Sequence, residues 1–216
     1  MLVVDCVLFD LDGTLYTSAE YSDRLEYEIV RYVSSRLQLP ERDCKRLLSE
    51  RRQSLGTLTR TLASLHMGRE DFFREMAERM EPSQYLKRDP RIRAMLRTLR
   101  EHGFSLALVS NSGRPLVIKI LEALGLDGEL FDTIVTSSEA EPKPSHASFQ
   151  MAMHKLGCVP DHTAYVGDRI ESELRPAHEL GIRTILIGSE RQSSPYVDIV
   201  LEKVTDVPKV IQRDLV

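Results

Sequence analysis

The sequence has little of what membrane proteins, secreted proteins and nucleic-acid-binding proteins need. None of its apolar runs approaches the ~20 residues of a membrane span, and its N-terminus lacks the basic stretch, apolar stretch and cleavage site of a signal peptide. Positive charge is not in excess, since the formal net charge is -4. We therefore expect neither nucleic acid nor a membrane surface as a partner.

Cysteine is also scarce. Cys6, Cys44 and Cys158 share no short spacing, which favours an interpretation of each as a small buried hydrophobe in a reducing compartment. The six histidines are scattered, without a carboxylate or cysteine at the spacing of metal ligands, so we expect no zinc site. The sequence thus predicts a globular protein of the cytoplasm.

Residues 17–88 have a helical period almost throughout. Residues 17–20 (Thr-Ser-Ala-Glu) are a capping-box candidate, and apolar residues then recur at steps of four until Pro40. Further short helices are predicted around residues 47–55, 58–65 and 72–80. This part of the chain is therefore predicted to be all helical.

The remainder of the chain alternates between strands and helices. Strands are predicted over residues 3–9, 106–110, 133–137, 163–168, 183–188 and 198–202, with helices between the later ones. Short apolar strands separated by amphipathic helices are typical of a parallel sheet covered on both faces. We predict an α/β fold with a Rossmann-like core, residues 1–16 and 89–216, and an inserted helical cap, residues 17–88.

The first strand ends in two acids, Asp10 and Asp12, at positions i and i+2. Residues two apart on a strand point the same way, so the two carboxylates would face one place and repel each other. In a parallel sheet the ligand crevice lies beyond the carboxyl ends of the strands. Ser110, Lys143 and Asp168 follow other strands at this edge, so one ammonium, one hydroxyl and three carboxylates would converge there.

Four segments carry a resemblance to a known family. In order, "FDLDGTLY", "LVSNS", "EPKPSHASF" and "VGDRIESELRPAHELGIRTILIG" resemble the four motifs of the haloacid dehalogenase superfamily, in its phosphatase branch. Residues 17–88 resemble the cap that this group inserts after the first strand. Within it, "RRQSLGTLTRTLASLHMGREDFF" is similar to pyrimidine 5′-nucleotidase-like members.

The resemblance implies a role for each residue at the sheet edge. Asp10 would be the nucleophile and a magnesium ligand, and Asp12 the general acid and base, with its backbone carbonyl on the metal. Ser110, Asn111 and Lys143 would hold the phosphate of the substrate. The residue chemistry agrees, because a carboxylate attacking phosphorus forms an acyl phosphate, and Mg²⁺ prefers oxygen ligands.

The metal-binding motif departs from the family pattern. Asp168 would bind the metal, but relatives carry another Asp four or five residues later, where this chain has Ser172 and Glu173. Glu173 is the favoured substitute, through water or through a neighbouring ligand, with Glu171 as the alternative. Both glutamates could instead be favourable acids in the first turn of a helix.

Several alternatives stay open. Asp12 with its following glycine could form an ordinary turn, and Lys143 between two prolines could be a solvated lysine. The favoured function is a magnesium-dependent phosphomonoester hydrolase that acts on a small phosphorylated metabolite through an aspartyl phosphate, as a monomer or homodimer. The rivals are a phosphotransferase such as a sugar phosphomutase, a haloacid dehalogenase, whose relatives lack the acid at Asp12, and a non-catalytic binding module.

Overall fold

A computed structural model describes residues 1–126, 128–188 and 194–213. Its centre is a six-stranded parallel sheet in the order β4-β3-β2-β5-β6-β7. The strands are β2 (Cys6–Phe9), β3 (Ser105–Ser110), β4 (Thr133–Thr136), β5 (Thr163–Gly167), β6 (Arg183–Ile187) and β7 (Ile199–Leu201). The predicted Rossmann-like sheet is confirmed, with the first predicted strand at its middle. Among the described residues, no helix is long and apolar enough to span a membrane.

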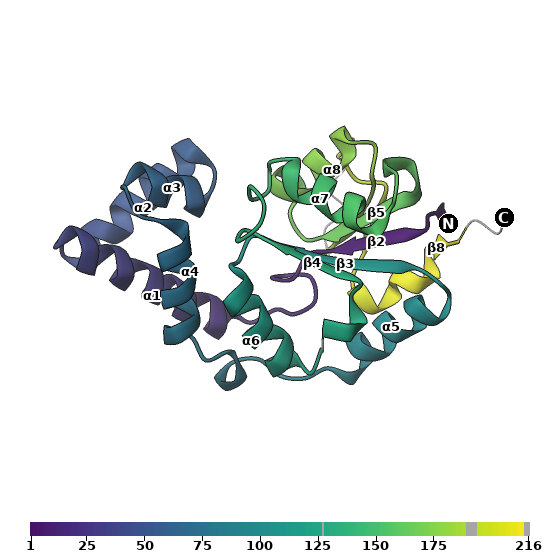
Figure 1. Cartoon of the computed structure of the whole chain (residues 1–216), viewed down its shortest axis with the longest axis horizontal. Coiled ribbons are helices and arrows are strands. Elements are labelled where there is room, and N and C mark those ends of the chain that lie inside the picture. The colour runs from purple at the N-terminus through teal and green to yellow at the C-terminus, as the bar shows by residue number, and fades with distance from the viewer. Residues whose placement is uncertain (127, 189–193, 214–216) are drawn as a thin grey trace.

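Helices cover both faces of the sheet, as Figure 1 shows. One face carries α5 (Pro90–Glu101) and α6 (Arg114–Leu124), and the other carries α7 (Ala147–Leu156) and α8 (Arg175–Glu179). Side chains of β2 alternate between the faces: Phe9 belongs to one buried apolar cluster and Leu8 to the other. Both are fully buried, so the strand that leads to the paired acids is packed on both of its faces.

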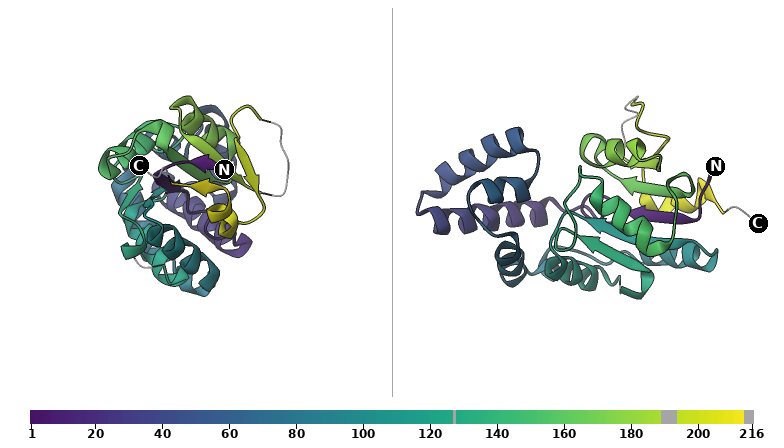
Figure 2. Two further views of the ribbon diagram at one scale, coloured as in Figure 1. Left: turned by 90° about the vertical axis from the view of Figure 1, so that its right-hand side faces the viewer. Right: turned by 45° about the horizontal axis from the view of Figure 1, so that its top comes forward.

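The helical segment stands beyond the edge at which the strands end (Figures 1 and 2). It contains α1 (Ala19–Leu37), α2 (Glu41–Leu55), α3 (Leu58–Ser64) and α4 (Arg69–Arg79). The second helix begins six residues earlier than predicted, because Pro40 occupies its N-cap position and two acids, Glu41 and Asp43, stabilise its first turn. The division into core and cap stays a prediction.

One helix of this segment is attached firmly to the body of the protein. α4 packs on α6, and its Phe73 lies so close to Gly113 that a Cβ there would come within 2.3 Å of the phenyl ring. Lys119 of α6 donates hydrogen bonds to the carbonyls of Ala77 (3.0 Å) and Met80 (2.8 Å) at the end of α4. The buried apolar cluster therefore continues from the sheet into the helical segment.

Two local features differ from the predicted elements. β1 (Leu2–Val3) pairs with β8 (Ile211–Gln212) in a small separate ribbon, so the predicted first strand is split at Asp5. The predicted helix between the strands over residues 163–168 and 183–188 consists of a π-helical turn, Ile170–Leu174, followed by the short α8. Such turns widen a helix by one residue and are frequent at functional sites.

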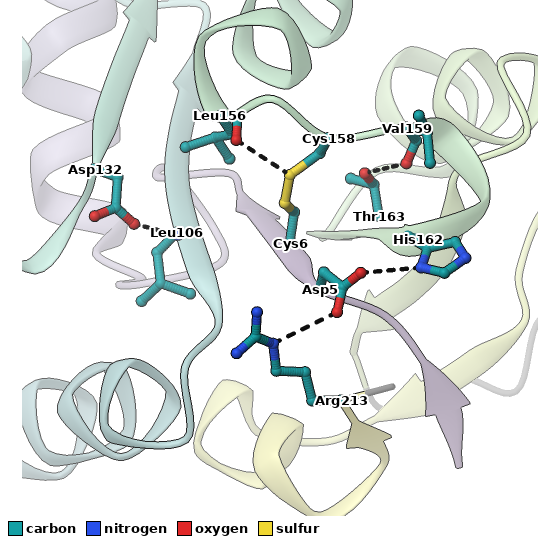
Figure 3. The surroundings of a disulfide bond; sticks show 10 residues. All are labelled: Asp5, Cys6, Leu106, Asp132, Leu156, Cys158, Val159, His162, Thr163 and Arg213. Atoms are coloured by element: carbon teal, nitrogen blue, oxygen red, sulfur yellow. Dashed lines mark hydrogen bonds and ion pairs between the residues drawn. A yellow bond between two sulfur atoms is a disulfide. The ribbon is translucent and has the colours of Figure 1, made fainter. Parts of the chain in front are cut away.

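Two of the three cysteines are paired, which the sequence analysis did not predict. Cys6, at the start of β2, forms a disulfide with Cys158, which follows α7 (Figure 3). The interpretation of these two residues as isolated buried hydrophobes was therefore wrong, whereas Cys44 is free and buried. The pair is 152 residues apart, so the bond closes a loop that contains most of the chain, including the whole helical segment.

Reduction of this disulfide is expected to lower the free energy of unfolding by about 2–5 kcal/mol, because a long loop regains its conformational freedom in the unfolded state. The measurement is denaturant unfolding with and without a reductant. Cys6→Ala, Cys158→Ala and the double variant should share one lowered stability and be insensitive to the reductant. Cys44→Ala should keep the sensitivity, and three free thiols in the denatured, unreduced protein would contradict the pairing.

Candidate active site

Lys143 lies at the centre of a buried polar cluster at the carboxyl edge of the sheet. Its ammonium group donates to Asp10 Oδ1 (2.5 Å), Glu173 Oε1 (3.1 Å), the Tyr165 hydroxyl (2.7 Å) and the Val109 carbonyl (3.0 Å). The side chain is completely buried, which a solvated lysine on a loop would not be. Burial acts to lower the pKa of Lys143, but the carboxylates of Asp10 and Glu173 outweigh it and raise the pKa, so the group stays charged.

Three carboxylates, two of which pair with this ammonium group, lie close together. Oxygens of Asp10, Asp168 and Glu173 lie within 4.8 Å of one another. Each residue also has one buried oxygen without a hydrogen-bond partner in the described part of the chain: Asp10 Oδ2, Asp168 Oδ1 and Glu173 Oε2. Lys143 and Arg169, whose Nε lies 3.8 Å from Asp168 Oδ2, supply two positive charges against three acids, and unpaired buried acceptors are costly. A hard divalent cation fits this set, because it would take up these free oxygens.

Two of these carboxyl groups, Asp168 and Glu173, have raised pKa values. Burial, followed by the charge of Asp10, raises the pKa of Asp168 above its usual range. Burial also raises the pKa of Glu173 to about 7, although Lys143 acts in the opposite direction. Both carboxyl groups are therefore harder to ionise than free ones, chiefly because they are buried and, to a smaller extent, because Asp10 lies beside them.

Asp12 lies beside the cluster with a different set of partners. Its Oδ1 accepts a hydrogen bond from the Tyr16 hydroxyl, and its Oδ2 lies 3.5 Å from Ser112 Oγ. Burial, with a smaller contribution from Asp10, raises the pKa of Asp12 to about 6. A carboxyl group with such a pKa can both give and take a proton near neutral pH.

The residue after Asp12 must be glycine. Gly13 has a φ of +94°, and a Cβ at this position would lie 2.3 Å from Asp168 Oδ2. Its N–H donates to the Tyr16 carbonyl (2.9 Å), which closes the turn that leads from β2 into α1. The Asp-Gly pair thus forms a turn, as the simpler interpretation had it, and the backbone of this turn lies directly against the carboxylate of Asp168.

The loop after β3 holds the expected phosphate-binding residues. Ser110 ends the strand, is 2 % exposed, and accepts the Ser112 N–H (3.1 Å) at its Oγ. The side chain of Asn111 forms two hydrogen bonds with the backbone of Lys143. Its Nδ2 donates to the Lys143 carbonyl (2.9 Å), and its Oδ1 accepts a hydrogen bond from the Lys143 N–H (2.8 Å). The side chain of Asn111 therefore positions the lysine loop, a role that the sequence did not predict.

The structure separates the two candidate glutamates. Glu173 is turned inward by the π-helical turn and joins the carboxylate cluster. Glu171 is 74 % exposed and pairs with Arg175 (3.1 Å), so it lies outside the site. The prediction of Glu171 as a residue near the metal is thus not supported by its position, and its charge assists only the local helix.

Two cavities adjoin this region. A cavity of about 60 Å³ lies between the loop that follows β3 and the helical segment, and its lining is mostly apolar. It is lined by Leu25, Ile29, Leu58, Thr59, Phe72, Phe73, Met76, Asn111, Ser112, Gly113 and Leu116. A cavity of about 780 Å³ lies at the two linkers between the sheet and the helices, and none of the clustered carboxylates lines it. Among the described residues, the clustered carboxylates line neither cavity: the smaller one meets the site at Ser112, and the larger one at Gly13 and Tyr16.

Comparisons with known proteins agree with this geometry. Residues 7–187 match the family model of the haloacid dehalogenase-like hydrolases. A phosphoglycolate phosphatase of Aquifex aeolicus is 30% identical over 97% of this chain and 98% of its own, and a glyceraldehyde 3-phosphate phosphatase of Methanocaldococcus jannaschii is 25% identical over 96% and 98%.

The fold is shared with solved structures. A phosphatase of Thermococcus onnurineus superposes with a TM-score of 0.71 at 22% identity, over 96% of this chain and 97% of its own. The resemblance seen in the four sequence motifs is thereby confirmed, and the strands that carry those motifs are the ones that meet at the cluster. The chain belongs to the haloacid dehalogenase-like hydrolase family.

Proposed function

We propose that this protein is a magnesium-dependent phosphomonoester hydrolase that acts on a small phosphorylated metabolite through an aspartyl phosphate on Asp10. The observation that carries the proposal is a fully buried lysine, paired with Asp10 and Glu173, beside three crowded carboxylates that each keep one buried oxygen free among the described residues. This is an arrangement for binding a cation and a phosphate at the same place. The names of the curated relatives support a phosphatase.

In the proposed reaction, each residue of the site has a separate role. Asp10 would attack phosphorus, and Lys143 and Ser110 would hold the phosphate oxygens in line with the attacking carboxylate. Asp12 would give a proton to the departing alkoxide and later take one from the attacking water. The nucleophile sits on the central strand, so its direction is fixed by packing on both faces of the sheet.

Asp10, Asp168 and Glu173 would hold Mg²⁺ through their free oxygens, with the backbone carbonyl of Asp12 as a further ligand. When bound, the cation would neutralise charge on the phosphate oxygens and on the carboxylates. Glu173 would then take the place that a second aspartate has in relatives. Its longer side chain reaches the cluster because the π-helical turn brings its backbone close to the end of β5.

Activity is expected to disappear in excess EDTA and to return with Mg²⁺ but only weakly with Ca²⁺, whose looser coordination does not suit an octahedral site. Mg²⁺ should also raise the melting temperature, since it binds the folded state. Glu173→Gln should weaken Mg²⁺ affinity by roughly 10–100-fold. Glu171→Gln is the matched control and should behave as the wild type. Full turnover in EDTA would refute the metal assignment.

The substrate is to be found by a screen of phosphorylated metabolites that includes phosphoglycolate, glyceraldehyde 3-phosphate, nucleoside monophosphates and sugar phosphates. The small, largely apolar cavity beside Ser112 favours a compact leaving group. Residues 17–88 would act as a cap that excludes water and selects this group. Transfer of phosphate to an added sugar rather than to water would favour the phosphotransferase alternative.

Two further expectations remain predictions about the protein in the cell. The first is a cytoplasmic location, which must be reconciled with the Cys6–Cys158 disulfide, because most cytosolic proteins keep their thiols reduced. The second is a monomeric or homodimeric state. Labelling of free thiols in freshly lysed cells and light scattering of the purified protein test them directly.

A further inference from the structure

Tyr16 is one of two side chains that donate a hydrogen bond to Asp12 among the described residues. Its hydroxyl donates to Asp12 Oδ1, whereas Ser112 Oγ lies at the outer limit of hydrogen bonding from Oδ2, at 3.5 Å. The two residues are also joined through the backbone, by a bridge between their segments and by the Gly13–Tyr16 hydrogen bond. The hydroxyl is thus held at Asp12 by the turn itself.

The ring of Tyr16 is fixed in turn by its neighbours. It packs edge-on against Tyr21, with ring centroids 5.9 Å apart, and Tyr21 packs against Tyr85, with centroids 6.3 Å apart. Tyr16 lies on the linker that enters the helical segment, and Tyr85 on the linker that leaves it. The hydroxyl of Tyr16 is therefore placed by aromatic contacts that join both linkers, and it has little freedom to turn away.

We propose that Tyr16 is a positioning residue for Asp12, which keeps Oδ1 occupied so that Oδ2 is the oxygen that delivers the proton to the leaving group. The inference rests on the proposed role of Asp12 as general acid. A donor on Oδ1 leaves the acidic proton on Oδ2, on the side of Ser112. Without this donor the carboxyl group could rotate, and a proton donor that is misplaced by an ångström loses much of its effect.

The chain offers a matched control for this hydroxyl. Tyr21 is 1 % exposed and contacts Tyr16, but its own hydroxyl has no hydrogen-bond partner among the described residues. Tyr16→Phe and Tyr21→Phe each remove one buried oxygen atom and leave the ring contacts in place. Only the first removes a bond to Asp12, so the difference between the two variants isolates that bond.

The test is single-turnover kinetics of phosphoenzyme formation with two esters, phosphoglycolate and p-nitrophenyl phosphate. An alkoxide needs a proton as it leaves, and p-nitrophenolate does not. Tyr16→Phe should slow the step with phosphoglycolate by roughly 10–100-fold and the step with p-nitrophenyl phosphate by less than about threefold. KM and melting temperature should change little. Tyr21→Phe should leave both rates unchanged.

Asp12→Asn serves as the reference, because it should show the same dependence on the leaving group to a greater extent. Wild-type rates in Tyr16→Phe, or equal slowing with both esters, would overturn the positioning role while the acid role of Asp12 stands. Equal slowing with both esters in Asp12→Asn would instead overturn the acid role itself, and the positioning role with it. The two failures are therefore distinguishable.

Discussion

Asp10→Asn is expected to abolish phosphate release, with a fall in kcat of at least about 10³-fold, because an amide of the same shape is a poor nucleophile. The fold should persist. Asp10 is one of three crowded carboxylates, and in the variant Lys143 keeps its bond to Glu173 (3.1 Å). The measurement is phosphate release by a purified variant whose circular dichroism matches the wild type.

The matched control is Asp5→Asn, four residues before the strand ends. Asp5 pairs with His162 (3.0 Å) and Arg213 (3.5 Å) at the opposite end of the strand (Figure 3). Its loss should affect the local contacts and leave kcat close to that of the wild type. Turnover of Asp10→Asn at the wild-type rate would show that another group attacks phosphorus.

Lys143→Met is expected to reduce kcat/KM by roughly 10²–10³-fold, because it removes a buried positive charge that would face the transferred phosphate. It should also destabilise the protein by about 3–5 kcal/mol, since Asp10 and Glu173 are left without a counter-charge. Mg²⁺ should restore part of this loss, because the cation can compensate the same carboxylates. Kinetics and thermal unfolding with and without Mg²⁺ measure both effects.

Lys155→Met is the control for Lys143→Met. Lys155 lies exposed on α7, at the far end of the helix that follows the lysine loop. A solvated lysine contributes little to stability or catalysis, so this variant should match the wild type in both measurements. Equal behaviour of the two variants would mean that Lys143 has no special role.

The sheet could be predicted from the sequence because each strand is a short run of apolar, often β-branched residues between amphipathic helices. The rule that ligands bind beyond the carboxyl ends of parallel strands then located Asp10, Ser110 and Asp168 together. These residues end β2, β3 or β5, which are neighbours in the sheet. Their convergence follows from topology alone, without any side-chain detail.

The contacts of Tyr16 and Tyr165 with the site were not predicted. A tyrosine in an apolar stretch gives the same sequence pattern whether or not its hydroxyl forms a hydrogen bond. Tyr165 belongs to the apolar cluster on one face of the sheet, and only its hydroxyl reaches Lys143. Glu171 and Glu173 are similarly alike in sequence. Their opposite directions depend on the π-helical turn, which no periodic pattern indicates.

The disulfide could not be predicted, because it forms only when two strands pair in a particular register, and the sequence does not show that register. Cys6 pairs in register with Thr163 on β5, and Cys158 precedes that residue by one short turn. Two cysteines 152 residues apart therefore meet only once β2 and β5 are placed side by side. In the same way, the attachment of α4 to α6 arises from tertiary packing, although α6 is apolar on much of its surface.

The central claim is that the phosphoryl group passes through Asp10. It is tested most directly by mixing the enzyme with Mg²⁺ and substrate, quenching within one turnover and reducing with borohydride, which converts an aspartyl phosphate to homoserine. Peptide mass spectrometry should find homoserine at position 10. With p-nitrophenyl phosphate as the substrate, Asp12→Asn should contain more of it, because formation of the phosphoenzyme then needs no proton donor while its breakdown is slowed. Turnover without homoserine at position 10 after the quench and reduction, or with the modification at another carboxylate, would contradict the account.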